Sequence, residues 1–166
     1  MAISSNGITH SVVFELFSDI APRACENFLA LCTGFKSKSG EEISYAGSEI
    51  HRIVPGMFIQ GGKVKAPENE SNIFEGEFED ETFHIKHKEI GLLGMCKRSG
   101  LKHSNECQFY ITTGAPLSFM DNVNVVFGRV ISGMHFIEQH IDALELSNEK
   151  SANMPVSICS AGVFSV

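Results

Sequence analysis

Arg52 and Gln60 are the residues of this sequence whose types and spacing best suit chemistry, and an apolar pair, Met57 and Phe58, lies between them. An arginine and a glutamine held beside an aromatic floor make a site for a neutral, partly apolar ligand with one carbonyl to orient. The alternative is structural: an edge-strand arginine that reaches into water and a glutamine that caps a bulge. Spacing alone leaves both interpretations open.

Two strands are needed to position these side chains. Residues 50–54 (I-H-R-I-V) are β-branched and apolar enough for a strand, and Pro55-Gly56 is a turn signal. The chain is expected to re-enter the sheet over residues 57–60 and to leave it at Gly61-Gly62. Because side chains alternate along a strand, Phe58 and Gln60 should share one face.

The composition is that of a single globular domain covering residues 1–166. Hydrophobic residues make up 43% of the chain, and the net charge is −7 without a long basic run. Nucleic acid and anionic membranes are therefore disfavoured partners. No signal peptide and no membrane-spanning apolar run are visible, which predicts a cytoplasmic or nuclear protein, or a domain of a longer chain. Nothing in the sequence demands more than a monomer.

The chain shows no signature of a cofactor, a metal site or a nucleophilic hydrolase. Its five cysteines are an odd number without a C-x-x-C pair, which favours free thiols over a disulfide framework. His84 and His87 lack cysteine or carboxylate partners at ligand spacing, so zinc is not expected there. No serine or cysteine lies beside a base in a recognisable motif.

The remaining pattern predicts a mainly β architecture with two helices. Strands are expected at residues 11–17, 91–96, 107–113, 125–131 and 156–163, with brief β-like pieces at 78–80 and 83–85. One helix should follow Asp19, with Pro22 in its first turn and an apolar stripe of Cys25, Phe28, Leu29 and Cys32. A second helix should carry Met134, Ile137, Ile141 and Leu144. Residues 35–47, 63–76 and 97–105 are predicted loops. So many short strands favour a barrel or a sandwich capped by the helices.

Five blocks of sequence together resemble the cyclophilins: F-E-L-F-S-D-I-A-P-R-A-C-E-N-F-L-A-L-C-T-G, H-R-I-V-P-G-M-F-I-Q-G-G, F-E-D-E-T-F, Q-F-Y-I-T-T and V-V-F-G-R-V. They occur in the family's order over about residues 10–164. The resemblance implies a closed eight-stranded antiparallel β-barrel with a helix over each end. It also implies peptidyl-prolyl cis–trans isomerase activity on Xaa-Pro bonds of proline-containing peptides or proteins, in protein folding or conformational switching.

The resemblance assigns roles to residues of this chain. Arg52 matches the family's catalytic arginine and Gln60 the glutamine that positions the substrate. Phe58, Tyr110 and Met120, with Met57 nearby, match the pocket for the proline ring. The remaining positions expected to bind substrate are Cys96, Lys97, Gln108, Phe119 and Asn124.

Several of these positions depart from the family pattern. Tyr110 replaces a phenylalanine and adds a hydroxyl that needs a partner. Phe119 replaces a tryptophan and so lacks an indole N–H, which predicts weak binding of cyclosporin. Asn124 replaces a histidine, and Met57-Phe58 stands where Phe-Met is common. The first ten residues form only a stub, which indicates an abbreviated first strand or a rearrangement.

The largest departure is the run C-K-R-S-G-L-K-H from Cys96 to His103, which is about two residues longer than usual and carries three cations. One hypothesis is a groove rim that selects acidic residues flanking the proline. The alternative is a solvated charged loop. Two functions stay open: a working isomerase, favoured by Arg52, and a weak or inactive proline-binding scaffold, favoured by the altered rim, Phe119 and Asn124.

Overall fold

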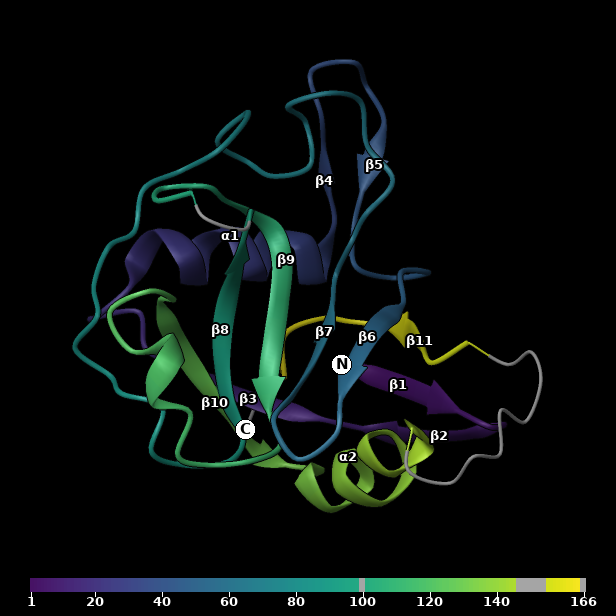
Figure 1. The fold of residues 1–166 in the computed structure, drawn as a ribbon. Coiled ribbons are helices and arrows are strands. Elements are labelled where there is room, and N and C mark those ends of the chain that lie inside the picture. Colours follow the sequence, from purple (N-terminus) through teal and green to yellow (C-terminus); the bar gives the residue numbers. More distant parts are fainter. Residues whose placement is uncertain (99–100, 146–154, 165–166) are drawn as a thin grey trace.

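The computed structural model describes residues 1–98, 101–145 and 155–164, which form three antiparallel sheets and two α-helices (Figure 1). The main sheet has the strand order β3-β10-β8-β9-β7-β6. Its strands are β3 (Val13–Leu16), β6 (Ile50–Val54), β7 (Phe58–Gly61), β8 (Leu92–Lys97), β9 (Asn105–Thr112) and β10 (Val126–Ser132). The second sheet, of order β11-β1-β2, contains β1 (Ala2–Ser5), β2 (Ile8–Ser11) and β11 (Ser157–Ser160). The third pairs β4 (Phe35–Lys36) with β5 (Glu42–Ile43), inside a segment predicted to be loop.

The mainly β character with two helices is as predicted. The predicted closed eight-stranded barrel is not found among the described residues, whose strands form separate sheets. Among the described residues the ladder is interrupted at two corners. At one corner the chain passes from β2 to β3 through Val12, which is buried and whose N–H donates to the Met1 carbonyl at 2.8 Å. At the other corner a single isolated bridge, Glu49 to Ser157, connects the β6 edge to β11. The pairing of the described strands therefore does not run as one continuous ladder.

The N-terminus is not the stub that the sequence suggested. β1 and β2 pair in register from Ala2 opposite Ser11 to Ser5 opposite Ile8. Asn6 and Gly7 connect them with φ values of 50° and 78°. Positive φ at both central residues is typical of a tight hairpin turn that matches strand twist, and Asn-Gly is its most favourable sequence.

Helix α1 (Pro22–Thr33) begins with Pro22 in its first turn and ends before Gly34, as predicted. Its buried stripe is somewhat different from the prediction, because Leu29 is 38% exposed while Ala24 and Leu31 point inward. Phe28 is the centre of an aromatic core, and its ring lies 5.3–5.7 Å from four others: Phe14, Tyr45, Phe109 and Phe127. This core holds the main sheet against the helix and so fixes the strands that carry the site.

Three smaller helical elements complete the described chain. They are the 3₁₀ turn η1 (Ser118–Met120), helix α2 (Met134–His140) and the 3₁₀ turn η2 (Asp142–Glu145). Helix α2 lies at the opposite end of the view from the β4-β5 hairpin (Figure 1). No described helix is long and apolar enough to cross a bilayer.

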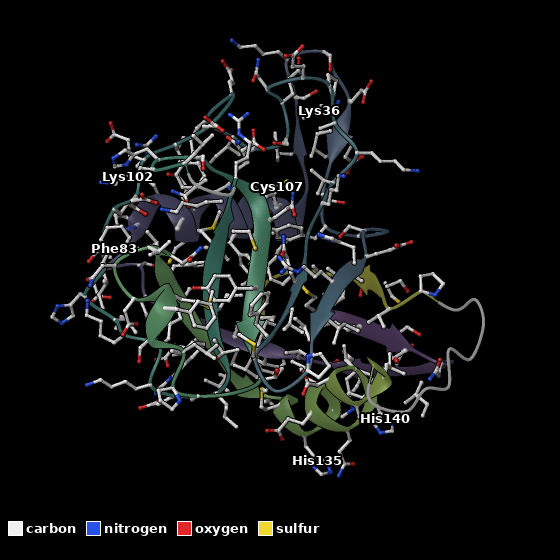
Figure 2. The ribbon with its side chains drawn as sticks, viewed as in Figure 1. Lys36, Phe83, Lys102, Cys107, His135 and His140 are labelled. Carbon is white, nitrogen blue, oxygen red and sulfur yellow. The ribbon has the colours of Figure 1, made fainter. Side chains whose placement is uncertain are left out.

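Of two other sequence predictions, the brief strands at 78–80 and 83–85 are not confirmed and the free thiols are. Residues 83–85 form no strand, and of residues 78–80 only Phe78 makes a β-bridge, to Asn105. All five cysteines are free thiols, as predicted; Cys107 lies on β9 in the middle of the molecule (Figure 2).

Candidate active site

Arg52, Gln60, Tyr110 and Gly94 form one row across four neighbouring strands. The β6-β7 register places Arg52 opposite Gln60, the β7-β9 register places Gln60 opposite Tyr110, and the β8-β9 register places Gly94 opposite Tyr110. Residues directly opposite each other in an antiparallel ladder point to the same face, so these groups are brought together by pairing alone. The sequence predicted the first three of these residues but not Gly94.

The Arg52 guanidinium lies over an aromatic side chain at the exposed end of this row. Its carbon is 5.3 Å from the centroid of the Phe58 ring, within the range of a cation–π interaction. Arg52 is exposed, whereas Phe58 is half-buried. Within the described part of the chain, the Arg52 side chain has no hydrogen bond or ion pair. Its donors are therefore available to a ligand that sits on Phe58.

Gln60 is held in place by a second amide. Its Nε2 donates to Oε1 of Gln108 at 3.0 Å, and both side chains are half-buried. Because an amide nitrogen carries two hydrogens, one donor of Gln60 has no partner within the described ranges. The pair thus presents an oriented N–H beside Arg52.

A second apolar cluster, separate from the main core, lies next to this polar pair, where the sequence analysis expected the pocket for the proline ring. Tyr110, Leu117 and Met120 are its buried members, and Met57, Phe58 and Cys96 pack partly buried against them. The rings of Phe58 and Tyr110 are 6.1 Å apart in an edge-to-face arrangement. Leu117 is the member that sequence analysis missed, because it comes from the irregular segment before η1 and no periodic pattern marks it.

Cys96 contributes bulk to this pocket rather than a reactive thiolate. Burial raises the pKa of the Cys96 thiol far above its ordinary value, although the nearby Arg52 charge partly opposes that shift. A thiol that stays protonated is a poor nucleophile, so nucleophilic chemistry at this position is disfavoured.

The Tyr110 hydroxyl finds the partner that its burial requires. Its oxygen lies 2.6 Å from Nε2 of His87, and the two rings stack with centroids 5.9 Å apart. Burial raises the pKa of Tyr110 well above its ordinary value, so the phenol stays protonated. Sequence analysis weighed His87 only as a metal ligand with His84. It missed this role because 23 residues separate His87 from Tyr110 in the chain.

Gly94 makes room for the Tyr110 ring. A Cβ atom built on Gly94 would lie 2.2 Å from both Cζ and Oη of Tyr110, much closer than atoms can pack. The lack of a side chain at Gly94 therefore accommodates a side chain of the neighbouring strand.

Phe119, Met120 and Asn124 lie on or just after η1. Met120 is buried in the pocket, whereas Phe119 is 60% exposed. The Asn124 side chain is engaged in the fold, because its Nδ2 donates to the Met95 carbonyl at 3.0 Å. Of these three residues, only Met120 belongs to the apolar cluster around Tyr110.

Lys97 lines a small cavity with Gln60, Cys96 and Gln108, but its charge is paired within the fold rather than free for the acidic residues that one sequence hypothesis proposed. Its Nζ lies 2.9 Å from Oδ2 of Asp80, and the two side chains are only 6% and 2% exposed. Asp80 also accepts hydrogen bonds from Nδ2 of Asn105 at 3.0 Å and from the backbone N–H of His103 at 3.1 Å. Burial by itself would raise the pKa of Asp80, but the hydrogen bonds from Lys97, Asn105 and His103 outweigh it and lower that pKa.

The next cation of this segment is also paired within the chain. The guanidinium of Arg98 contacts the carboxylate of Glu77. These contacts pin the segment to residues 77–80, and Lys97 also lies over the ring of Phe83 at 5.8 Å. Lys102 remains exposed, and Figure 2 places it on the same outer side of the molecule as Phe83.

A family model described as cyclophilin type peptidyl-prolyl cis-trans isomerase/CLD matches residues 1–163. The chain belongs to the cyclophilin family. Its similarity to the NK-tumor recognition proteins of Mus musculus and Homo sapiens is 41% identity over 157 residues, covering 92% of this chain and 10% of each relative. It is 38% identical over 152 residues to a Bos taurus protein named probable inactive peptidyl-prolyl cis-trans isomerase-like 6, covering 89% of this chain and 47% of that relative. The chain therefore spans less than half of the length of these relatives.

Proposed function

We propose that this cyclophilin domain catalyses cis–trans isomerisation of Xaa-Pro peptide bonds. The observation that carries the proposal is the guanidinium of Arg52 above Phe58, unpaired among the residues that the structure describes and beside the oriented amide of Gln60. The apolar pocket of Tyr110, Leu117 and Met120 adjoins them and suits a proline ring.

The reaction needs no bond to be broken. The partial double bond of the peptide sets a rotation barrier of about 18–20 kcal/mol. As the bond rotates, the prolyl nitrogen becomes pyramidal and its lone pair leaves conjugation with the carbonyl. A donor from Arg52 aimed at that lone pair stabilises the twisted state more than either planar state, which is differential binding of a transition state. Guanidinium suits this role because it stays charged and presents fixed donors.

Gln60 and the pocket supply binding and orientation. The free N–H of the Gln60 amide is proposed to donate to a substrate carbonyl, while Gln108 prevents that amide from rotating. Burying the proline ring contributes about 1.5–3 kcal/mol, enough for a weakly held substrate. The proposed substrate contacts also include Met57, Phe58 and Cys96, which pack around the pocket.

The test is NMR exchange spectroscopy on a short Xaa-Pro peptide with the parent protein, Arg52→Ala and His51→Ala. Loss of one preorganised donor predicts that Arg52→Ala lowers the exchange rate by about 10²–10³-fold. His51 is the matched control, because it is an exposed neighbour of Arg52 on β6 that lines a different surface cavity, with Glu49 and Lys63. Binding without accelerated exchange by the parent protein, or equal rates for the parent and Arg52→Ala, would contradict the proposal.

The second candidate is a proline-binding scaffold with little or no turnover. The engagement of Asn124 with the Met95 carbonyl favours it, because this amide is already committed to the fold. One relative also carries the words probable inactive in its name. Peptide-induced shifts without exchange in the same NMR experiment would identify this function. In either case we propose weak cyclosporin binding, because the exposed Phe119 offers no N–H donor.

Further proposals concern the partners. Selection of acidic residues near the proline now depends on the exposed Lys102, because Lys97 and Arg98 are paired within the domain. A monomeric single domain over residues 1–166, and a cytoplasmic or nuclear location, stay predictions of the sequence.

A further inference from the structure

A chain of three polar side chains runs from the surface to the floor of the proposed proline pocket. Oδ1 of Asp121 lies 2.8 Å from Nδ1 of His87, and Nε2 of His87 lies 2.6 Å from the Tyr110 hydroxyl. The His87 side chain is fully buried, whereas Asp121 is 21% exposed. None of the sequence motifs that suggested isomerase activity includes His87 or Asp121.

The hydrogen-bonding capacities of these groups fix the direction of the chain. Two hydrogen bonds from His87 lower the pKa of Asp121: the larger effect comes from the backbone N–H, at 2.8 Å, and the smaller from the side chain. The Asp121 carboxylate is therefore an acceptor. Nδ1 of His87 must then donate to Asp121, which in the neutral imidazole leaves the lone pair on Nε2. The Tyr110 hydroxyl, a protonated phenol, donates to that lone pair. The single hydrogen of the phenol is thereby directed away from the pocket.

The same contacts hold two pocket walls together. The Asp121 carboxylate is one of several contacts between the segment at His87 and the residues around η1. The N–H of Leu117 donates to the His87 carbonyl at 2.8 Å and Nζ of Lys86 donates to Oδ1 of Asn122, so the two walls stay joined when Asp121 is replaced. Gly94 lies beneath the Tyr110 ring, and the absence of a Cβ there lets the ring approach β8 closely. The floor of the pocket is therefore set from behind by His87 and from below by Gly94.

We infer that His87 and Asp121 are positioning residues that set the affinity of this pocket for proline. They act through the Tyr110 hydroxyl: they keep its O–H hydrogen-bonded to Nε2 of His87, so that the aromatic carbons of the ring face the ligand. When the chain of bonds is intact, the pocket floor offers an apolar surface that suits a pyrrolidine ring. When Asp121 is removed, Nε2 of His87 is free to carry the proton, and the hydroxyl must find another acceptor or face the ligand. This inference rests on the proposed function only in naming proline as the ligand.

The test combines a spectroscopic and a binding measurement. Long-range ¹H–¹⁵N NMR reports which nitrogen of His87 carries the proton, and titration with a short Xaa-Pro peptide gives Kd. We expect the Nδ1–H form in the parent protein and the Nε2–H form in Asp121→Ala. Loss of the oriented hydroxyl should weaken peptide binding by about 5- to 10-fold in Asp121→Ala. Asp121→Asn, whose amide oxygen can still accept from Nδ1, should restore the parent form and most of the affinity.

The decisive comparison repeats Asp121→Ala in a Tyr110→Phe background. If Asp121 acts through the hydroxyl, its removal should change Kd by less than about twofold there, because no hydroxyl remains to be oriented. Lys86→Met is the matched control. It removes the bond from Lys86 to Asn122, another link between the same two segments, without touching His87. It should leave both the protonated nitrogen and Kd unchanged.

Two results would overturn the inference. One is an Nε2–H form of His87 in the parent protein. The other is a loss of affinity from Asp121→Ala that is the same in the parent and in the Tyr110→Phe background. These measurements need no catalysis. If the parent fails to accelerate exchange, the isomerase proposal fails while the coupling of Asp121 to the pocket still stands or falls on Kd and the NMR signature.

Discussion

Gly94→Ala is the substitution whose effect the site geometry predicts most sharply. The added methyl group would meet Cζ and Oη of Tyr110 at 2.2 Å, and the ring cannot retreat without leaving His87. Overpacking of this kind costs about 1–3 kcal/mol. Loss of the buried hydrogen bond to His87 adds about 0.5–1.5 kcal/mol. We therefore expect the free energy of unfolding to fall by about 1.5–4.5 kcal/mol.

Urea unfolding followed by circular dichroism measures this change, and a peptide titration reports the displaced pocket floor. Gly162→Ala is the matched control, because a Cβ there meets nothing within 4 Å and should be nearly neutral. In a Tyr110→Leu background the shorter side chain ends before the clashing atoms, so most of the cost of Gly94→Ala should disappear. An unfolding free energy within about 0.5 kcal/mol of the parent for Gly94→Ala, with unchanged Tyr110 ring signals, would refute the reasoning.

Two further predictions concern stability. The lowered pKa of Asp80 means that its carboxylate stabilises the fold above its unfolded-state pKa of about 3.9, and that this contribution is lost as the pH falls through the lower folded-state value. Asp80→Asn should thus lower the unfolding free energy by about 3 kcal/mol at pH 7, and its difference from the parent should shrink below pH 4. Urea titrations at several pH values measure this difference, and a difference that does not change with pH would contradict the role of charge. Tyr45→Phe should cost about 1–3 kcal/mol, because the fully buried Tyr45 hydroxyl donates to the Cys107 carbonyl at 2.6 Å; an unchanged urea midpoint would show that this bond contributes nothing.

The sequence predicted the elements of the site better than the connections between them. Arg52, Phe58 and Gln60 could be placed because a β-hairpin is a local structure, in which alternation and a Pro-Gly turn determine the faces. The N-terminal hairpin was missed although its Asn-Gly turn is a local signal that could have revealed it. Leu117 offered no signal, because it lies in irregular backbone where periodicity carries no information.

Tertiary structure determines which partners the cations at and after the end of β8 bind. Nothing near Lys97 in the sequence indicates that its partner is Asp80, which lies 17 residues earlier in the chain. A charged run is read as solvated by default, and only the folding of residues 77–80 across it converts Lys97 into a member of a buried ion pair.

The sequence by itself determined the family, the mainly β architecture and the hairpin that carries Arg52 and Gln60, because these depend on motifs and on short-range alternation. Tertiary structure alone decided how the sheets meet, which glycine lies under Tyr110 and which groups satisfy its hydroxyl. The physical reason is that strand register and side-chain hydrogen bonds join residues far apart in the chain. Their partners are selected by packing and by the need to satisfy buried polar groups, neither of which a local pattern encodes.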